Sequence, residues 1–310
     1  MLLQEALEIH KKSKWKIDIL ETLWAEIKND YCNQEFYKKI VDKLPNWEYF
    51  ISDLDWTFFR WTLIKEAFTV FAKFLREQDL TTINLEKYKQ FLDDFKLFKK
   101  LEKEAYNKKI DYNDYLTAGL FLINKYHDLA DWDEFLIYLK DFFYRKEKVN
   151  PFRFSMKKLK EVIKNWQYFL FVSWASSFVF TIYLELLKDY IKKELWEEYV
   201  KNIYGFCSYA DPKAKEVYNL WNMQGKTDFI KELKNKNIFT KLIGWMWDTN
   251  ADYWIANHLD KGADFYFMNA SYSAITQYEK LASKDINFHF IFERKDVIFE
   301  YNIDDIKILN

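Results

Sequence analysis

The sequence predicts a mainly α-helical protein, arranged as a multi-helix array or an irregular α-solenoid or bundle, with a small C-terminal β-α-β-β element. Two observations favour helices. The 310 residues include only five glycines and three prolines, which leaves few of the turn residues that β-rich folds and glycine-loop folds need. Apolar side chains also recur at helical spacing through most of the chain.

Three regions are expected: an N-terminal helical region (1–150), a central helical region with a buried apolar helix (151–260) and a small α+β element (261–310). The predicted helices span residues 2–29, 34–44, 47–77, 84–107, 111–127, 131–147 and 155–203, followed by short helices separated near Gly225 and Gly244. In the last region, 263–268, 286–292 and 297–303 are rich in β-branched and aromatic residues, which is typical of strands, and 271–283 reads as a helix.

Two segments are apolar around most of the helical circumference. The first is Trp47–Glu77, and the second is Trp166–Leu184, whose 19 residues carry no charge. The second reaches the length of a membrane span, but its serine and threonine side chains favour a buried core helix. We expect both helices at the centre of the protein, with four aromatic side chains largely buried: Phe58, Trp61, Phe169 and Trp174. The similar pentapeptides Asn46–Phe50 and Asn165–Phe169 leave an internal duplication open.

Charge and cysteine content give limited information about function. The chain has 47 basic and 48 acidic residues, and only five of the basic residues are arginine. This balance shows no nucleic-acid signature, and the lysine-rich, asparagine-rich composition is typical of an AT-rich genome. Cys32 and Cys207 fit neither a disulfide framework nor a zinc site. With no secretory signal in the first residues, we expect a cytoplasmic protein that does not contact membranes.

The sequence shows no family resemblance and no motif typical of a metal site. Its four histidines are scattered, and acidic pairs such as Asp53/Asp55 and Asp93/Asp94 read as exposed helix positions. We therefore expect no metal and no cofactor. A remote alternative is a metal-dependent nuclease of the PD-(D/E)xK type that would use Asp264, Glu293 and Lys295, although the helix predicted after Asp264 departs from the usual hairpin.

One polar stripe lies in an otherwise apolar helix. Asp53, Thr57 and Arg60 share a helical face, and a buried charge needs a partner because an isolated one is very costly. The stripe is either a structural ion pair with a neighbouring helix or a polar patch in a binding pocket. We take these three residues as the candidate binding residues and assign no catalytic residue.

The leading hypothesis for function is a cytoplasmic protein–protein interaction module, acting as a scaffold, an inhibitor or a subunit of a multicomponent system. It depends on the excess of tryptophan and tyrosine, which often anchor protein interfaces. The partner would be another protein. The alternative is an enzyme or sensor with an aromatic-lined small-molecule pocket. The sequence leaves open whether the chain is an enzyme, and it does not indicate the oligomeric state.

Overall fold

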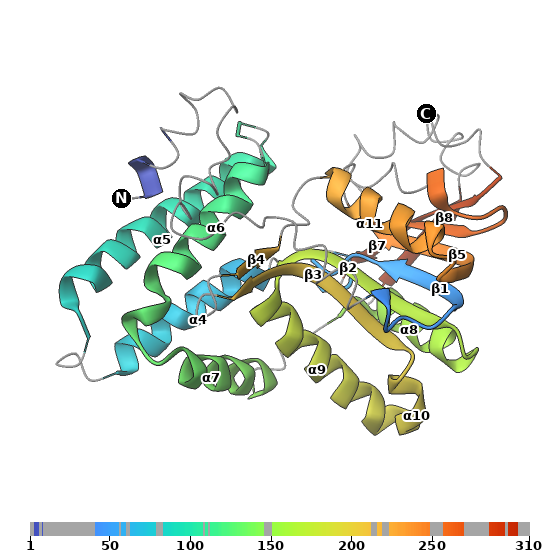
Figure 1. The fold of residues 1–310 in the computed structure, drawn as a ribbon, viewed down its shortest axis with the longest axis horizontal. Helices are drawn as coiled ribbons and strands as arrows, with labels where there is room; N and C mark the ends of the chain where they lie inside the picture. Colours follow the sequence, from blue (N-terminus) through green and yellow to red (C-terminus); the bar gives the residue numbers. More distant parts are fainter. Residues whose placement is uncertain are drawn as a thin grey trace.

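The chain forms a mostly parallel β-sheet with helices on both faces and a helical insert to one side (Figure 1). The computed structural model describes the following residues: 3–5, 8, 41–55, 57–59, 63–78, 83–107, 109–110, 112–145, 151–211, 216–218, 223–248, 257–269, 285–294 and 297–302. Every structural statement below concerns these residues.

The sheet contains eight strands in the described part of the chain, in the order β4-β3-β2-β1-β5-β6-β7-β8. The strands are β1 (Trp47–Ser52), β2 (Tyr168–Ser176), β3 (Ile203–Asp211), β4 (Glu216–Tyr218), β5 (Phe239–Trp247), β6 (Asp264–Met268), β7 (Asn287–Arg294) and β8 (Val297–Asn302). The six central strands are parallel, and the two edge strands are antiparallel to their neighbours.

The strand order reverses its direction at β1. From β1 the chain adds β2 and then β3 on one side, and later crosses over to add β5, β6 and β7 on the other side. In open α/β sheets of this kind, ligands bind outside the carboxyl ends of the strands at such a switch point. The carboxyl ends of β1, β2 and β5 are therefore the first place to look for a functional site.

Both faces of the sheet are buried. Phe50 and Phe169 contribute to the hydrophobic cluster on one face, whereas Tyr49, Ile51 and Leu170 contribute to the cluster on the other face. Since successive side chains of a strand point to opposite faces, both odd and even positions are apolar. This double burial explains why the central strands are nearly continuous apolar runs in the sequence.

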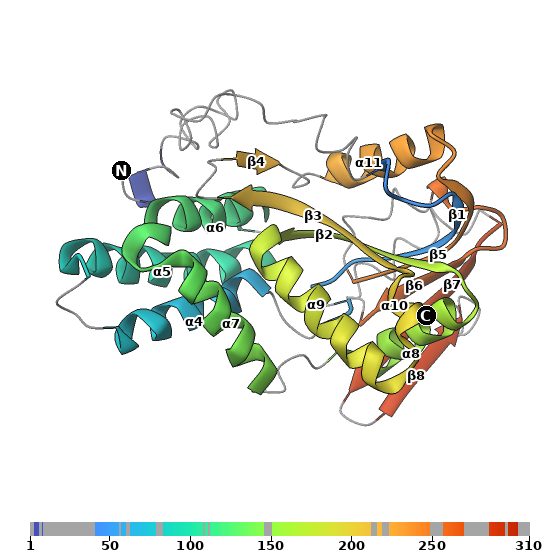
Figure 2. The same cartoon turned by 60° about the horizontal axis from the view of Figure 1, so that its bottom comes forward.

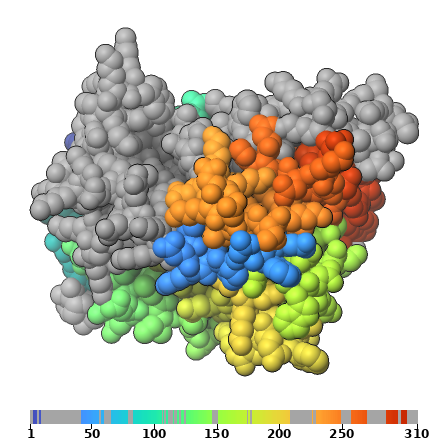
Figure 3. Space-filling model, turned by 45° about the vertical axis from the view of Figure 1, so that its right-hand side comes forward, coloured from blue at the N-terminus to red at the C-terminus, as the bar shows by residue number. Residues whose placement is uncertain are grey.

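Helices from the second half of the chain cover the two faces (Figure 2). On one face lie α8 (Arg153–Lys164) and α9 (Ser177–Glu194), with the short α10 (Glu197–Val200) after them. On the other face lies α11 (Met223–Asn235), which packs through Phe229, Ile230 and Leu233. The space-filling view shows the segment of β1, coloured blue, between orange segments from 223–247 and yellow segments near α10 (Figure 3).

A helical insert separates β1 from β2 in the sequence. It consists of α4 (Leu63–Glu77), α5 (Leu85–Tyr106), α6 (Tyr112–Tyr126), a 3₁₀ turn (His127–Leu129) and α7 (Trp132–Arg145). Its two connections to the sheet lie side by side, because Phe59 forms a β-bridge with Pro151. The N–H of Phe152 also donates to the carbonyl of Phe58 at 2.8 Å.

The predicted mainly α fold is wrong: the protein is an α/β protein. The predicted helix Trp47–Glu77 is strand β1, a loop and helix α4, and the predicted core helix Trp166–Leu184 is strand β2 followed by the start of α9. Likewise, 155–203 contains β2 between two helices, and Gly244 lies inside β5. Strands from all three predicted regions join one sheet, and the central region, predicted to be helical, contributes four of them.

Other predicted elements are confirmed. The helices predicted at 84–107, 111–127 and 131–147 correspond to α5, α6 and α7, and the side chain of Asn84 caps α5 by accepting from the N–H of Lys87. The strand at 263–268 and the C-terminal hairpin are present as β6, β7 and β8. Phe58 and Phe169 are fully buried.

Some predictions concern parts of the chain that are not described. The predicted helix 271–283, nearly all of 2–29, most of 34–44, Trp61 and the side chain of Trp174 lie outside the described residues. None of the helices in the described part of the chain is both long enough and apolar enough to cross a membrane.

Candidate active site

Polar side chains gather where β2, β1 and β5 end, at the switch point of the sheet. The register pairs Ser52 of β1 with Phe171 of β2 and with Met246 of β5. The residues that follow these positions on the three strands therefore lie at one level. They include Asp53 after β1, Ser173 near the end of β2 and Asp248 directly after β5.

Asp53 occupies the centre of this group. Its N–H donates to the carbonyl of Met246 at 3.0 Å, which extends the pairing of β1 with β5 by one residue. Its carboxylate Oδ1 accepts from the N–H of Leu54 at 2.7 Å. Asp53 is 8% exposed, so its carboxylate is fixed in position and nearly removed from solvent.

Lys226 provides the opposite charge. Its Nζ lies 3.1 Å from Oδ2 of Asp53, and its side chain is fully buried. Lys226 lies in the first turn of α11, where the helix dipole disfavours a cation. A lysine is almost never fully buried without a partner. The ion pair with Asp53 therefore offsets the unfavourable position of the Lys226 charge at the start of α11.

The loop after β1 carries two more polar residues at alternate positions. Thr57 is fully buried, and its Oγ1 donates to Oδ1 of Asp248 at 3.1 Å. The carbonyl of Thr57 accepts from Oγ of Ser155 at 2.7 Å, which ties the loop to α8. Asp55 lies between Asp53 and Thr57 and is half-buried. This short loop thus carries the carboxylates of Asp53 and Asp55 and the hydroxyl of Thr57.

Ser173 completes the polar group on the β2 side. It is fully buried, and its Oγ accepts from the N–H of Ala175 at 3.1 Å. That contact leaves the hydroxyl proton to serve as a donor.

The oxygen donors at this site suit a hard divalent cation. Asp53, Asp55 and Asp248 are carboxylates, and Mg²⁺ prefers oxygen ligands. Among the described residues no group of three or more His, Cys, Asp or Glu side chains is arranged to hold a metal ion. A Mg²⁺ ion here would therefore need substrate phosphate and water as further ligands, beside one or two carboxylates.

The structure brings together two of the three predicted binding residues, although not on a helix. Asp53 and Thr57 lie on the loop after β1, and Arg60 lies outside the described residues. The interpretation of Asp53 and Asp94 as exposed helix positions is wrong. Asp53 is buried against Lys226, and the buried carboxylate of Asp94 accepts from the hydroxyl of Tyr126 at 2.5 Å.

Sequence reasoning missed Ser173, Lys226 and Asp248 as site residues and assigned no role to Asp55. A usable signal was present, because Asp53, Asp55 and Thr57 alternate directly after the apolar run Tyr49–Ile51. Asp248 likewise follows the apolar run that ends at Trp247. Acidic residues directly after buried parallel strands indicate a site at the carboxyl edge of a sheet, but this signal appears only once the runs are recognised as strands.

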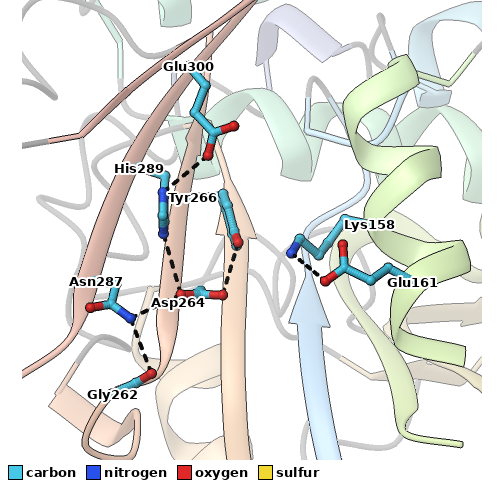
Figure 4. Close-up of polar contacts among 8 residues, drawn as sticks. All are labelled: Lys158, Glu161, Gly262, Asp264, Tyr266, Asn287, His289 and Glu300. Atoms are coloured by element: carbon cyan, nitrogen blue, oxygen red, sulfur yellow. Dashed lines mark hydrogen bonds and ion pairs between the residues drawn. The ribbon is translucent and has the colours of Figure 1, made fainter. Parts of the chain in front are cut away.

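A second polar cluster lies on β6, β7 and β8 (Figure 4). The carboxylate of Asp264 accepts from Oη of Tyr266 at 3.0 Å and from Nδ2 of Asn287 at 3.2 Å, and it lies 3.4 Å from Nε2 of His289. Burial raises the pKa of Asp264, but the hydrogen bonds from His289, Asn287 and Tyr266 outweigh burial and hold this pKa at about 2. On the other side of the ring, Nδ1 of His289 lies 3.2 Å from Glu300.

The remote nuclease hypothesis does not fit this geometry. Asp264 begins β6, and its register partner is Asn287 at the start of β7. Glu293 lies six residues further along β7, which is about 20 Å at the rise of a β-strand. Its carboxylate instead accepts from the N–H groups of Arg153 and Phe154 at 3.0 and 2.9 Å, so that it caps α8. Lys295 lies outside the described residues.

Comparisons with known proteins concern the fold alone. No family model matches the chain, and no curated protein matches it. A solved structure of a protein of unknown function from Bordetella pertussis Tohama I aligns with a TM-score of 0.51 at 10% identity, over 77% of this chain and 97% of that chain. A probable phosphoserine phosphatase from Vibrio cholerae aligns with a TM-score of 0.41 at 11% identity, over 79% and 62% of the two chains.

The hypothesis of a helical interaction module is wrong. It assumed a mainly helical array without a catalytic constellation, whereas the chain forms an α/β sheet with buried ionisable groups at its switch point. These features favour the alternative, an enzyme.

Proposed function

We propose that the protein is a phosphoryl-transfer enzyme that hydrolyses a phosphate monoester through a covalent intermediate on Asp53. The observation that carries the proposal is the buried pair of Asp53 and Lys226 at the switch point, 3.1 Å apart. An aspartate carboxylate is a known nucleophile in enzymes that form aspartyl phosphates. Lysine is a common clamp on the phosphoryl group that is transferred.

In the first step, Oδ of Asp53 attacks phosphorus and the bond from phosphorus to the ester oxygen breaks. The leaving oxygen takes a proton, and Asp55, two residues from the nucleophile, is the proposed donor. In the second step a water attacks phosphorus, Asp55 takes back a proton, and inorganic phosphate leaves with the carboxylate of Asp53 restored. Lys226 holds the phosphoryl oxygens in both steps.

The proposal includes a divalent cation such as Mg²⁺, which the carboxylates of Asp53 and Asp248 would hold together with substrate phosphate and water. When bound, the cation neutralises charge on the phosphoryl oxygens. The hydrogen bond from Thr57 fixes one carboxylate oxygen of Asp248. We also propose a cytoplasmic location, since Cys207 is a free thiol whose pKa burial raises well above its usual range.

The test is the hydrolysis of para-nitrophenyl phosphate with and without Mg²⁺. The wild-type protein should hydrolyse it only in the presence of Mg²⁺, and Asp53→Asn should lower the rate by about 10³-fold or more because the nucleophile is lost. The matched control is Asp264→Asn, since Asp264 is also a hydrogen-bonded carboxylate but lies on β6, two strands away from β1. This variant should retain the wild-type rate.

A labelling experiment removes the ambiguity of a variant that fails to fold. Wild-type protein incubated with ³²P-labelled acetyl phosphate and quenched in acid should carry an acyl phosphate, which hydroxylamine releases. The label should be absent from Asp53→Asn protein with an unchanged circular dichroism spectrum. Hydrolysis at the wild-type rate by a folded Asp53→Asn variant would refute the proposal.

A further inference from the structure

A groove lies between α8, α9 and the end of α7, on the side of α8 that faces away from the sheet. Its volume is about 1140 Å³, which exceeds the usual range of small-molecule pockets, roughly 300–1,000 Å³. Pro151, which lines it, is bridged to Phe59 on the loop of the proposed active site. The groove therefore begins beside that loop and extends along α8.

The groove combines a positive rim with an apolar floor. Five of its lining residues are basic and two are acidic: Arg153, Lys157, Lys160, Lys164, Lys193, Glu161 and Asp189. The three lysines of α8 recur at intervals of three and four residues, so they form one row along the helix. Met156, Leu186 and Leu187 contribute the floor.

A cluster of aromatic side chains lies shortly after the last groove-lining residues of α8 and α9, Lys164 and Lys193. Trp166 follows α8, Trp196 follows α9, and each packs on Tyr199 with ring centroids 5.2 and 6.3 Å apart, respectively. Trp166 is 55% exposed and Trp196 is 71% exposed. Trp166 also has a φ of 58°, at a position after a helix where glycine is usual. A large apolar residue thus occupies a strained position in contact with solvent.

We propose that this groove binds an acidic, amphipathic segment of a partner protein. Carboxylates of the partner would pair with the lysine row, its apolar side chains would lie on the floor, and one end would pack on Trp166, Trp196 and Tyr199. Tryptophan and tyrosine are the residues that most often dominate the energy of protein interfaces. The inference does not depend on the proposed activity.

Nucleic acid and membranes fit the groove less well. Lys160 and Lys193 lie over the rings of Tyr190 and Tyr144, each with Nζ 5.3 Å from the ring centroid. A base would have to displace these ammonium groups in order to stack on the tyrosines. A bilayer presents a flat surface, whereas the apolar floor lies within a concave groove and is accessible only to an inserted chain.

The test measures binding of a fluorescein-labelled helical peptide of leucine, alanine and glutamate by fluorescence anisotropy. The peptide is about twelve residues long, because α8 extends for about 18 Å. Lys157→Glu with Lys164→Glu should weaken binding about ten-fold, through two lost charge pairs and two new repulsions. Both lysines are exposed. Trp196→Ala should weaken binding by a similar factor.

The matched control is Lys89→Glu with Lys96→Glu on α5. These lysines are exposed and have the same spacing of seven residues, so the variant has the same net charge and should bind like wild type. The same peptide with lysine in place of glutamate should not bind. All measurements are repeated in the Asp53→Asn background, where binding should be unchanged, so that loss of catalysis and loss of docking are separate results.

Two further probes can overturn the proposal. Tighter binding of a labelled oligothymidylate than of the acidic peptide would assign the groove to nucleic acid. Sedimentation with vesicles that contain phosphatidylserine, abolished by the Lys157/Lys164 variant, would assign it to a membrane. Equal affinities of the Lys157/Lys164 variant and the Lys89/Lys96 control for the acidic peptide would also refute the proposal.

Discussion

Asp53 and Lys226 should be coupled by about 2–3 kcal/mol in a double-mutant cycle of unfolding free energies. The side chain of Lys226 is fully buried, that of Asp53 is 12% exposed, and the charged atoms lie 3.1 Å apart. At an effective dielectric constant of about 20, Coulomb's law gives a gross attraction of about 5 kcal/mol at this separation. Desolvation of both groups offsets part of that attraction.

The cycle compares wild type with Asp53→Asn, Lys226→Met and the double variant. Each single substitution should cost about 3–5 kcal/mol, because it leaves one buried charge without its main partner. The double variant leaves neither charge, so it should unfold at a higher urea concentration than the sum of the single costs predicts. The coupling energy is the informative quantity, since each side chain also has other contacts that the single costs include.

The assay is urea denaturation followed by circular dichroism at a fixed pH of 7.5. Equal slopes of free energy against urea are needed for the comparison, because a changed slope indicates a changed denatured state. Additive costs, with a coupling energy near zero, would show that Asp53 and Lys226 do not form a pair in solution. The geometric basis of the proposed active site would then be lost.

Two further predictions concern stability. The depressed pKa of Asp264, about 2, lies below the value of about 3.9 for an unfolded aspartate. The ionised form therefore contributes stability above pH 4 that is lost as the pH falls toward 2, and urea midpoints of Asp264→Asn should fall less than those of wild type over this range. Gly244→Ala should destabilise the protein by about 1–3 kcal/mol, since its Cβ would lie 2.8 Å from the carbonyl of Asp264 and 2.6 Å from Phe50; a wild-type urea midpoint would contradict that packing.

The sequence predicts the helical insert well and the sheet poorly, for a physical reason. Helices such as α5 have one polar face and a capping residue, Asn84, so the pattern with a period of 3.6 residues is visible. Strand β1 is buried on both faces, and its apolar side chains include Trp47 and Phe50, which are also spaced like residues of a helix. A short apolar run of this kind cannot be assigned to a strand or a helix from periodicity alone.

Because the central strands were assigned as helices, most of the candidate site was not predicted. Asp53 and Thr57 were selected because a polar residue in an apolar segment needs a partner, and in the structure each has one. The partners Lys226 and Asp248 lie more than 150 residues away in the sequence and come into contact only through the order of the parallel strands. Local patterns hold no information about that order, so half of the site required the three-dimensional structure.

Because Phe59 is bridged to Pro151, the insert could be exchanged for another segment without moving its two connections to the sheet. A segment of about ninety residues leaves the sheet and returns at a single point, so the distance between its ends is set by the bridge and does not depend on the length of the segment. The entropy of closing such an excursion grows only slowly with its length. Evolution can therefore lengthen, shorten or replace these helices while the strand ends beneath them stay in register.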